Sequence, residues 1–303
     1  MKILNIGSLN IDRSYQVPHI VQPGETLCST SYCVYCGGKG LNQSIALARA
    51  GAEVWHAGAV GEDGDILIQA LADSGVHTEW VIRSRQPSGH AIIQVDPNGQ
   101  NSIVICPGAN NTITPQVIDH ALESFAPGDL LLLQNEVSHV GYAIQAGHAK
   151  GLLVALNPSP IDDSLLASDL SGVDLFMVNE VEGTLLAGGE AHRPADLLTA
   201  LARHYPHAAL LLTMGDQGAL YQDTHGRICQ PIFPCQAVDT SGAGDTFCGY
   251  FLAALAEGSA PADALRLAAA AASIAVSRPG TAAAIPTRQE AEALCRTGQA
   301  SAV

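Results

Sequence analysis

The stretch LLLLQNEVSHVGYAIQAGHAKGLLVALN, residues 130–157, decides the fold class. Its apolar ends, residues 130–134 and 152–157, have the continuous hydrophobic character of strands that are buried on both faces. Residues 140–150, which lie between them, favour a helix. A strand, a helix and a second strand in this order predict a βαβ unit with parallel strands.

The same alternation extends toward both ends of the chain. Further strands are predicted at residues 3–7, 54–60, 78–82, 175–178, 210–213 and 219–222, and further helices at 40–50, 65–72, 115–124, 180–187, 195–203, 244–256, 262–277 and 288–295. We therefore expect one α/β domain over residues 1–303, built on a doubly wound, mostly parallel sheet flanked by helices.

Four short β-prone pieces interrupt this alternation. They cover residues 13–17, 32–36, 90–95 and 102–105, and the last two are joined by the turn Asp96-Pro97-Asn98-Gly99, which predicts a hairpin. These pieces cannot form a core of their own. We expect them to form a small inserted β lid, drawn from residues 12–36 and 88–106.

Composition and charge exclude several classes of protein. The 303 residues are 47% hydrophobic, which is enough for a sizeable core and argues against disorder. The net charge is −15, from 14 basic and 29 acidic residues, and no basic run is present, so nucleic acid is a poor partner. An anionic ligand must be held by helix N-termini, glycine-rich backbone and a metal ion. With no apolar run long enough for a signal or a membrane span, we expect a cytoplasmic protein.

Eight cysteines leave two interpretations open. Cys28, Cys33 and Cys36 have a spacing that also opens some iron-sulfur sites, with Cys106 as a distant fourth. On an extended strand, however, Cys33 and Cys36 point to opposite faces. We expect free buried thiols rather than a cluster or disulfides.

The run Asp239-Thr240-Ser241-Gly242-Ala243-Gly244-Asp245-Thr246 directly precedes an apolar helix. Small residues let the backbone approach a phosphate closely, and the helix N-terminus supplies free N–H donors and a partial positive charge. A carboxylate in such an anion hole repels phosphate, but its presence makes sense if Asp245 accepts the proton of an attacking hydroxyl. The alternative is an ordinary aspartate at a helix N-terminus, where negative charge is favourable.

Two other segments suggest a polar ligand site. Residues 37–42, Gly-Gly-Lys-Gly-Leu-Asn, again precede a helix but are not a phosphate-binding P-loop, because Gly40 follows Lys39 where Ser or Thr is required. Asn10 and Asp12 lie two residues apart and share one face of an extended strand, an arrangement suited to a sugar diol. Taken alone, either segment is equally consistent with a turn.

Together these motifs make the chain resemble the ribokinase branch of the PfkB-type carbohydrate kinases, from Gly7 to Pro286. Residues 37–42 and 239–245 are similar to the two signatures of that family, in the same order. Shorter matches cover residues 7–12, 23–26, 134–136, 156–158 and 179–182. Leu41, Asn135 and Val137 depart from the best known pattern, which bears on the choice of sugar more than on the chemistry.

The resemblance implies a role for individual residues. It implies a catalytic base at Asp245 and an anion hole formed by Gly242, Ala243 and Gly244. The implied sugar-binding positions are Asn10, Asp12, Gly38, Lys39, Asn42, Glu136 and Asp245. The implied nucleotide-binding positions are Asn179, Thr213, Gly215 and Gly244, and Asn179 with Glu182 matches the motif that organises magnesium, largely through water. A potassium ion is implied as activator, held at Asp239, Ser241, Ala275, Arg278, Gly280 and Ala284.

The implied activity is ATP-dependent phosphorylation of the hydroxymethyl group of a small sugar, ribose first, by a homodimer that pairs through the lid. Asn10, Asp12 and Glu136 favour an uncharged pentose, and the lid has few basic residues for a phosphorylated one. Kinases of the same family for deoxyribose, fructose or its phosphate, a sugar acid or a nucleoside remain alternatives. A catalytically silent sugar-binding regulator is a third reading, and it predicts loss of the base or the anion hole, both of which are intact.

Overall fold

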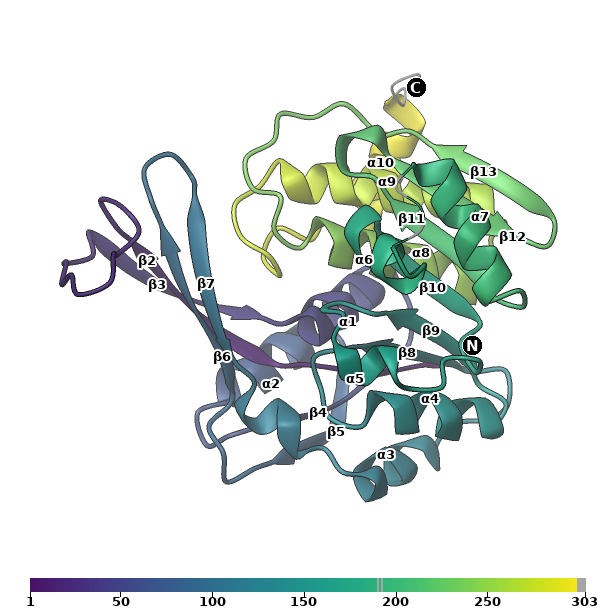
Figure 1. Cartoon of the computed structure of the whole chain (residues 1–303), viewed down its shortest axis with the longest axis horizontal. Helices are drawn as coiled ribbons and strands as arrows, with labels where there is room; N and C mark the ends of the chain where they lie inside the picture. The colour runs from purple at the N-terminus through teal and green to yellow at the C-terminus, as the bar shows by residue number, and fades with distance from the viewer. Residues whose placement is uncertain (190, 192, 299–303) are drawn as a thin grey trace.

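The computed structural model describes residues 1–189, 191 and 193–298 and contains two β-sheets (Figure 1). The larger sheet has nine strands, in the order β13 (Gly226–Gln230), β12 (Ala219–Asp223), β11 (Ala209–Thr213), β10 (Leu175–Asn179), β9 (Leu153–Asn157), β8 (Leu130–Gln134), β1 (Ile3–Ile6), β4 (Val54–Val60) and β5 (His77–Arg83). From β11 to β5 every neighbouring pair is parallel, whereas β12 and β13 join antiparallel at one edge. The expected doubly wound α/β fold is confirmed.

Helices cover both faces of this sheet, and the strands alternate their side chains between the two layers. One face is covered by α1 (Lys39–Arg49), α2 (Asp65–Asp73), α8 (Ala243–Ala256), α9 (Pro261–Val276) and α10 (Arg288–Thr297). The other is covered by α3 (Pro115–Leu122), α4 (Val140–Ala149), α5 (Asp163–Leu166), α6 (Glu180–Leu186), α7 (Pro194–His204) and the 3₁₀ turn η1 (Gly108–Thr112). Leu131 and Leu133 of β8 face the second layer, and Leu130 and Leu132 face the first. This two-sided burial explains the uninterrupted apolar runs.

The small sheet contains four strands in the order β3 (Ser31–Gly37), β2 (Asn10–Gln16), β6 (Gly89–Val95) and β7 (Asn101–Cys106). All pairs are antiparallel except β2 with β6. It projects from the main body as two long hairpin-like arms (Figure 1). The inserted sheet was therefore predicted correctly, and its action as a lid stays a prediction.

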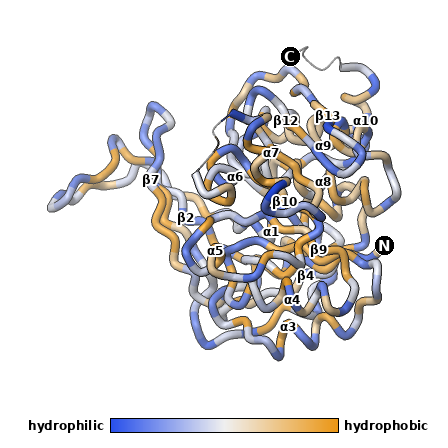
Figure 2. Tube along the Cα trace, turned by 45° about the vertical axis from the view of Figure 1, so that its right-hand side comes forward, coloured by the Kyte–Doolittle hydropathy of each residue, from blue (hydrophilic) through white to orange (hydrophobic). Residues whose placement is uncertain are grey.

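Residues of hydrophobic type continue along the small sheet beyond the main body, as the colouring of the backbone trace shows (Figure 2). Val34, Ile92 and Val104 are exposed. Val34 and Ile92 both pair with Arg13 of β2, and Val104 pairs with Ile92, so the three side chains lie in one row on the same face of the sheet. An exposed apolar face of this kind marks an interaction surface. It is the feature that pairing with a second copy of the chain would cover.

Some local structure was not predicted from the sequence. The edge strand β13, of sequence Gly-Arg-Ile-Cys-Gln, has no apolar alternation and is a strand only because it pairs with β12. Five of the cysteines expected to be buried are exposed, namely Cys28, Cys33, Cys106, Cys229 and Cys235, and only Cys248 is fully buried. The expectation of buried thiols was wrong because several cysteines lie on the thin small sheet and on edge segments.

Within the described ranges, no three His, Cys, Asp or Glu side chains are grouped to hold a metal ion. No helix described is long and apolar enough to span a membrane.

Candidate active site

The chain enters the site where β1 ends and continues directly into β2 of the small sheet. The loop between these strands packs against the start of α1, with the Leu41 N–H donating to the Ser8 carbonyl at 3.0 Å. Gly40 allows this contact, since a Cβ atom there would lie only 2.4 Å from the Ser8 nitrogen. The two segments 7–12 and 37–42, separate in the sequence, therefore form one wall of the site.

Asp245 lies in the first turn of α8, and only 7% of its surface is exposed. Its Oδ2 accepts a hydrogen bond from Asn42 Nδ2 at 3.0 Å, and its Oδ1 accepts one from Gln43 Nε2 at 2.9 Å. The Oδ1 atom of Asn42 is buried and has no hydrogen-bond partner among the described residues. An unpaired buried acceptor beside a carboxylate is suited to a ligand hydroxyl.

Two carboxylates lie on the sugar side of the predicted site. Burial, and then the charge of Glu136, raise the pKa of Asp12 to about 6. Glu136 accepts hydrogen bonds from the Ser8 hydroxyl and from the Lys39 backbone N–H, the latter at 3.0 Å. Asn10 is held through its Oδ1 by Asn110 Nδ2 at 2.8 Å. The site therefore gathers oxygen acceptors that match the hydroxyl donors of an uncharged sugar.

Asn10, Asn110 and Glu136 border a cavity of about 820 Å³ that opens between the small sheet and the start of α4. The cavity contains no lysine or arginine among its lining residues. A ligand with a second phosphate group would lack a counter-charge there. The preference for an uncharged substrate stays a prediction.

Lys39 lies between the sugar side and the phosphate side of the site. It borders a pocket of about 70 Å³ together with Asp245, Asn179 and Glu182. Burial alone would lower the pKa of Lys39, but the charges of Asp245, Glu136 and Glu182 together raise it. The sequence assigned Lys39 to the sugar. Its position suits it equally to neutralise a phosphoryl group that approaches Asp245.

The predicted anion hole is the start of α8. Gly242 precedes the helix with φ of +72°, a left-handed conformation that favours glycine. A Cβ atom on Gly244 would meet nothing within 4 Å, so open space lies in front of this backbone. The first N–H groups of any helix lack intrahelical acceptors. Here the Ala243 N–H donates to the Thr240 carbonyl at 3.3 Å, which leaves the N–H groups of Gly244 and Asp245 as the candidate anion donors.

A separate cavity of about 390 Å³ lies on the other side of Gly244. Thr213, Gly215, Ala243 and Gly244 border it, and apolar residues of α8 and α9 form its wall, namely Phe247, Ala269, Ala272 and Val276. A cavity of this size with apolar walls is typical of a site for a flat organic group. The structure thus brings the predicted nucleotide positions Thr213, Gly215 and Gly244 together.

Asn179 and Glu182 form a reciprocal capping box at the start of α6. Asn179 Oδ1 accepts from the Glu182 N–H at 2.9 Å, and Glu182 Oε2 accepts from the Asn179 N–H at 3.0 Å. The box leaves Glu182 Oε1 without a protein donor among the described residues. Glu182 and Asn179 border the same small pocket as Asp245 and Lys39.

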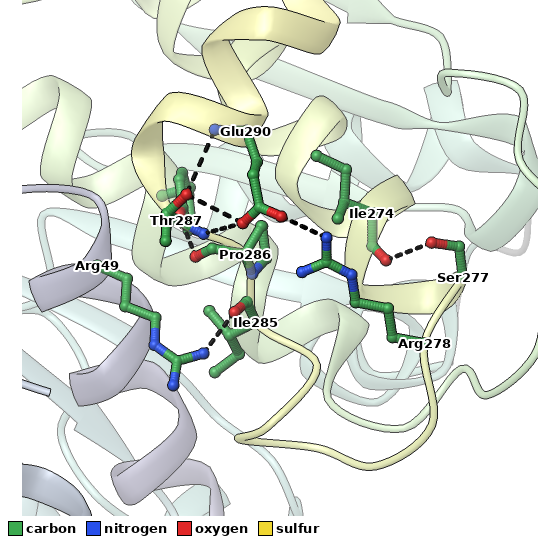
Figure 3. A network of polar contacts seen from close by, with 9 residues as sticks. Arg49, Ile274, Ser277, Arg278, Ile285, Pro286, Thr287 and Glu290 are labelled. Atoms are coloured by element: carbon green, nitrogen blue, oxygen red, sulfur yellow. Dashed lines mark hydrogen bonds and ion pairs between the residues drawn. The ribbon is translucent and has the colours of Figure 1, made fainter. Parts of the chain in front are cut away.

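Asp239 joins the two loops that carry most of the predicted potassium positions, and Ala275 lies in the last turn of α9. Asp239 Oδ1 accepts from the Ser241 N–H at 2.9 Å and its Oδ2 accepts from the Gly280 N–H at 3.0 Å. The side chain of Arg278 turns away to Glu290, which leaves only its backbone for an ion (Figure 3). Ala284 is buried and has no side-chain oxygen.

Arg49, at the end of α1, stabilises the loop that follows α9. Its guanidinium donates to the carbonyl of Ile285 (Figure 3). It also donates to the carbonyl of Ala282 at 3.0 Å. Tyr250 of α8 donates to the neighbouring Pro286 carbonyl at 2.7 Å. Helices α1 and α8, which carry Asn42 and Asp245, are thus both tied to the loop.

Ser8, Gln43, Asn110 and Asn157 were given no individual site role from the sequence, although Ser8 and Asn157 lie in the matched segments 7–12 and 156–158. Each contacts a predicted site residue or its partner. All four are buried polar residues. The signal that could have identified Gln43 is its position in the middle of a helix in which residues 40–47 are all buried. Buried polar groups require partners, and the partner here is Asp245.

A buried carboxylate at a helix N-terminus, close to a nucleotide-sized cavity and bonded to Asn42 and Gln43, is the arrangement of a phosphotransferase of the sugar-kinase class. The model of the pfkB family of carbohydrate kinases matches residues 1–288. The chain belongs to this family of carbohydrate kinases.

Individual relatives agree with this assignment. The chain is 36% identical over 296 residues to a ribokinase of Haemophilus influenzae, covering 94% of this chain and 95% of the relative. It is 37% identical over 259 residues to a deoxyribokinase of Salmonella typhi, covering 83% and 84%. The structure of Arabidopsis thaliana ribokinase complexed with ribose and ATP matches with a TM-score of 0.84 at 29% identity, over 97% of this chain and 98% of that one.

Proposed function

We propose that the protein transfers the γ-phosphoryl group of ATP to the hydroxymethyl oxygen of ribose, giving ribose 5-phosphate and ADP. The observation that carries this proposal is the position of Asp245. Its buried carboxylate borders the phosphate-side pocket and bonds to Asn42, whose unpaired Oδ1 lies ready for a hydroxyl. The ribokinase relatives supply the choice of sugar and nucleotide.

In this mechanism Asp245 takes the proton of the hydroxymethyl group as its oxygen attacks the γ-phosphorus. The bond from that phosphorus to the bridging oxygen breaks, and ADP leaves with the electron pair. Asn10, Asp12 and Glu136 orient the sugar through its other hydroxyls, while the N–H groups at the start of α8 and the Lys39 ammonium stabilise charge on the phosphoryl oxygens. The protein contributes position and charge, which is what phosphoryl transfer requires.

Glu182 and Asn179 fit a magnesium ion that accompanies ATP. The Glu182 oxygen that is free of protein donors borders the small pocket, and carboxylate and amide oxygens are the ligands that magnesium prefers. The ion retains several waters in such sites, so these residues would hold it largely through water. When bound, magnesium neutralises charge on the phosphate oxygens.

The proposal is tested by measuring ADP release with magnesium and potassium over a panel of pentoses, hexoses and nucleosides. We expect ribose to give the highest kcat/KM, with product phosphorylated at the hydroxymethyl position by mass spectrometry and NMR. A site that bonds a particular hydroxyl discriminates strongly against an analogue that lacks it, so 2-deoxyribose should be a much poorer substrate. Comparable or better turnover of another sugar would replace ribose in the proposal.

Deoxyribose is the second candidate, because the deoxyribokinase relative is as similar to this chain as the ribokinase relatives are. The paired acceptors Asn10 and Asp12 favour ribose, since both neighbouring hydroxyls of a diol then find partners. The same panel separates the two sugars directly.

We expect potassium to activate the enzyme. The carbonyls of Ser241, Gly280 and their neighbours suit a monovalent cation, and Asp239 already joins the two loops that carry them. A bound ion would fix the start of α8 so that its N–H groups point correctly before charge develops. Potassium should raise kcat/KM severalfold over tetramethylammonium at matched ionic strength, with sodium weaker. Identical activity in both salts would show that no cation acts there.

The homodimer also belongs to the proposal. Its support is the exposed apolar face of the small sheet around Val34, Ile92 and Val104. A strict monomer in light scattering at micromolar concentration would remove it.

A further inference from the structure

A continuous chain of buried polar side chains lies behind Asp245. It consists of Gln43, Gln134, Asn5, Ser44 and His56, and the surface of every one of them is 0% exposed. They come from α1, β8, β1 and β4, so four elements converge on the catalytic carboxylate. Polar groups buried this completely require hydrogen bonds, and a network of them fixes the conformation of its members.

The chain starts at His56, whose orientation can be assigned from its neighbours. His56 Nε2 lies 3.2 Å from the Gly7 carbonyl, which only accepts, so Nε2 carries the proton. His56 Nδ1 then accepts from the Ser44 hydroxyl at 2.8 Å. Burial lowers the pKa of His56 to about 4, which agrees with a neutral ring at physiological pH.

Each following bond takes its direction from the one before. With its proton given to His56, the Ser44 oxygen accepts from Asn5 Nδ2 at 2.8 Å. Asn5 Nδ2 also donates to the Gly40 carbonyl at 2.8 Å, so Asn5 Oδ1 is turned toward Gln134. Gln134 Nε2 donates to that oxygen at 3.0 Å and to Gln43 Oε1 at 2.7 Å.

The last link reaches the reacting group. Because Gln43 Oε1 is turned to Gln134, only its N–H groups face the other way. One donates to Asp245 Oδ1 at 2.9 Å and the other to Asn157 Oδ1 at 3.0 Å. Asn157 is held in turn by donating to the Met177 carbonyl at 2.8 Å. A flipped Gln43 amide would place its oxygen against the Asp245 carboxylate and is excluded by the rest of the chain.

This orientation leaves one acceptor unpaired. Gln134 Oε1 is buried without a hydrogen-bond partner among the described residues, packed so closely on Gly7 that a Cβ atom there would lie 2.3 Å away. An unpaired buried acceptor is destabilising, because it has lost its hydrogen bonds to water. The two hydrogen bonds that Gln134 Nε2 donates, to Asn5 and to Gln43, offset this loss. They fix the orientation of the Gln134 amide.

We propose that Gln43 is a positioning residue for the catalytic base, and that Gln134, Asn5, Ser44 and His56 fix its orientation. Gln43 holds Asp245 Oδ1, and Oδ2 accepts from Asn42. The unpaired Oδ1 of Asn42 marks the ligand side, so Oδ2 is the oxygen that receives the sugar proton. The proposal rests on the assignment of Asp245 as base. It adds a hydrogen-bond network that determines which oxygen of the Asp245 carboxylate reacts and how that carboxylate is oriented.

The first test is Gln43→Leu, which keeps the volume and removes the donors. Displacing a catalytic group from its productive geometry typically lowers the reaction rate about 10²-fold. We expect kcat to fall about 10- to 100-fold while the KM values for sugar and ATP change less than threefold, because Gln43 borders none of the three cavities of the site. The melting temperature, measured alongside, reports the structural effect separately.

The second test is a double-mutant cycle with Ser44→Ala, which removes one hydroxyl far from the ligands and should fold normally. We expect it to lower kcat severalfold in the wild-type background and to have no further effect in Gln43→Leu, because the chain is then already broken. Ser74→Ala is the matched control, since that hydroxyl bonds only to the Ala70 carbonyl at the end of α2 and should leave kcat unchanged.

A folded Gln43→Leu enzyme with kcat within twofold of the wild type would overturn the proposal, as would equal losses in kcat and in both KM values. If Gln43→Leu does not fold, wild-type kcat in Ser44→Ala would overturn it instead. Should Asp245 not be the base, Asp245→Asn would remain active. That outcome is distinct from a failure of the positioning role alone.

Discussion

Asp245→Asn should fold, bind sugar and ATP, and lose kcat by about 10²- to 10⁴-fold, the usual contribution of a positioned base. The amide cannot take up the hydroxyl proton, although it has the same shape as the carboxylate. The fold tolerates it because Asn42 can turn over and offer its unpaired Oδ1 to the new amide N–H. A large loss of kcat therefore reports the chemistry and not the packing.

The measurement is steady-state kinetics together with calorimetric binding of ribose and of an ATP analogue. Unchanged affinities and a melting temperature close to that of the wild type are the controls. Turnover near the wild-type value would remove Asp245 from the mechanism. Loss of binding to both ligands would make it a structural residue.

Asp12→Ala should raise the sugar KM about 10- to 100-fold and leave the ATP KM nearly unchanged. Hydrogen bonds to a charged group contribute about 1.5–3 kcal/mol, and each 1.4 kcal/mol is a factor of ten. Asp12 lies on the sugar side of the site, beside Glu136 and away from the nucleotide cavity. Asp263→Ala, at an exposed aspartate in the first turn of α9, is the matched control.

The pH dependence gives an independent check on the same residue. The pKa of Asp12 is raised to about 6 by burial and by the charge of Glu136. The carboxylate that accepts two hydroxyls exists above this pKa, so the sugar KM should rise as the pH falls below about 6. This acidic limb should be absent from Asp12→Ala and should move to lower pH in Glu136→Gln. Equal KM changes for sugar and ATP would instead indicate that Asp12 only supports the fold.

Local sequence was sufficient for most of the fold. The apolar run of β8 is continuous because both faces are covered, and the glycines before α1 and α8 mark the places where backbone must approach backbone or ligand. These signals depend on neighbours within a few residues. The antiparallel edge strand β13 was missed because its only strand-forming influence is its pairing with β12.

By itself, the sequence determined the α/β class, the inserted small sheet and the two glycine motifs that carry the family resemblance. Only the tertiary structure decided which side chains meet. Gln43 and Asp245 lie 202 positions apart, Ser8 and Glu136 lie 128 apart, and Asn10 and Asn110 lie 100 apart. The packing of α1 against α8 brings the first pair together, and the positions of β8 and η1 beside the segment that follows β1 bring the other two together. Periodicity predicts that a helix has a buried face, but a hydrogen bond depends on atoms being placed within a few tenths of an ångström, and that placement comes from the whole core.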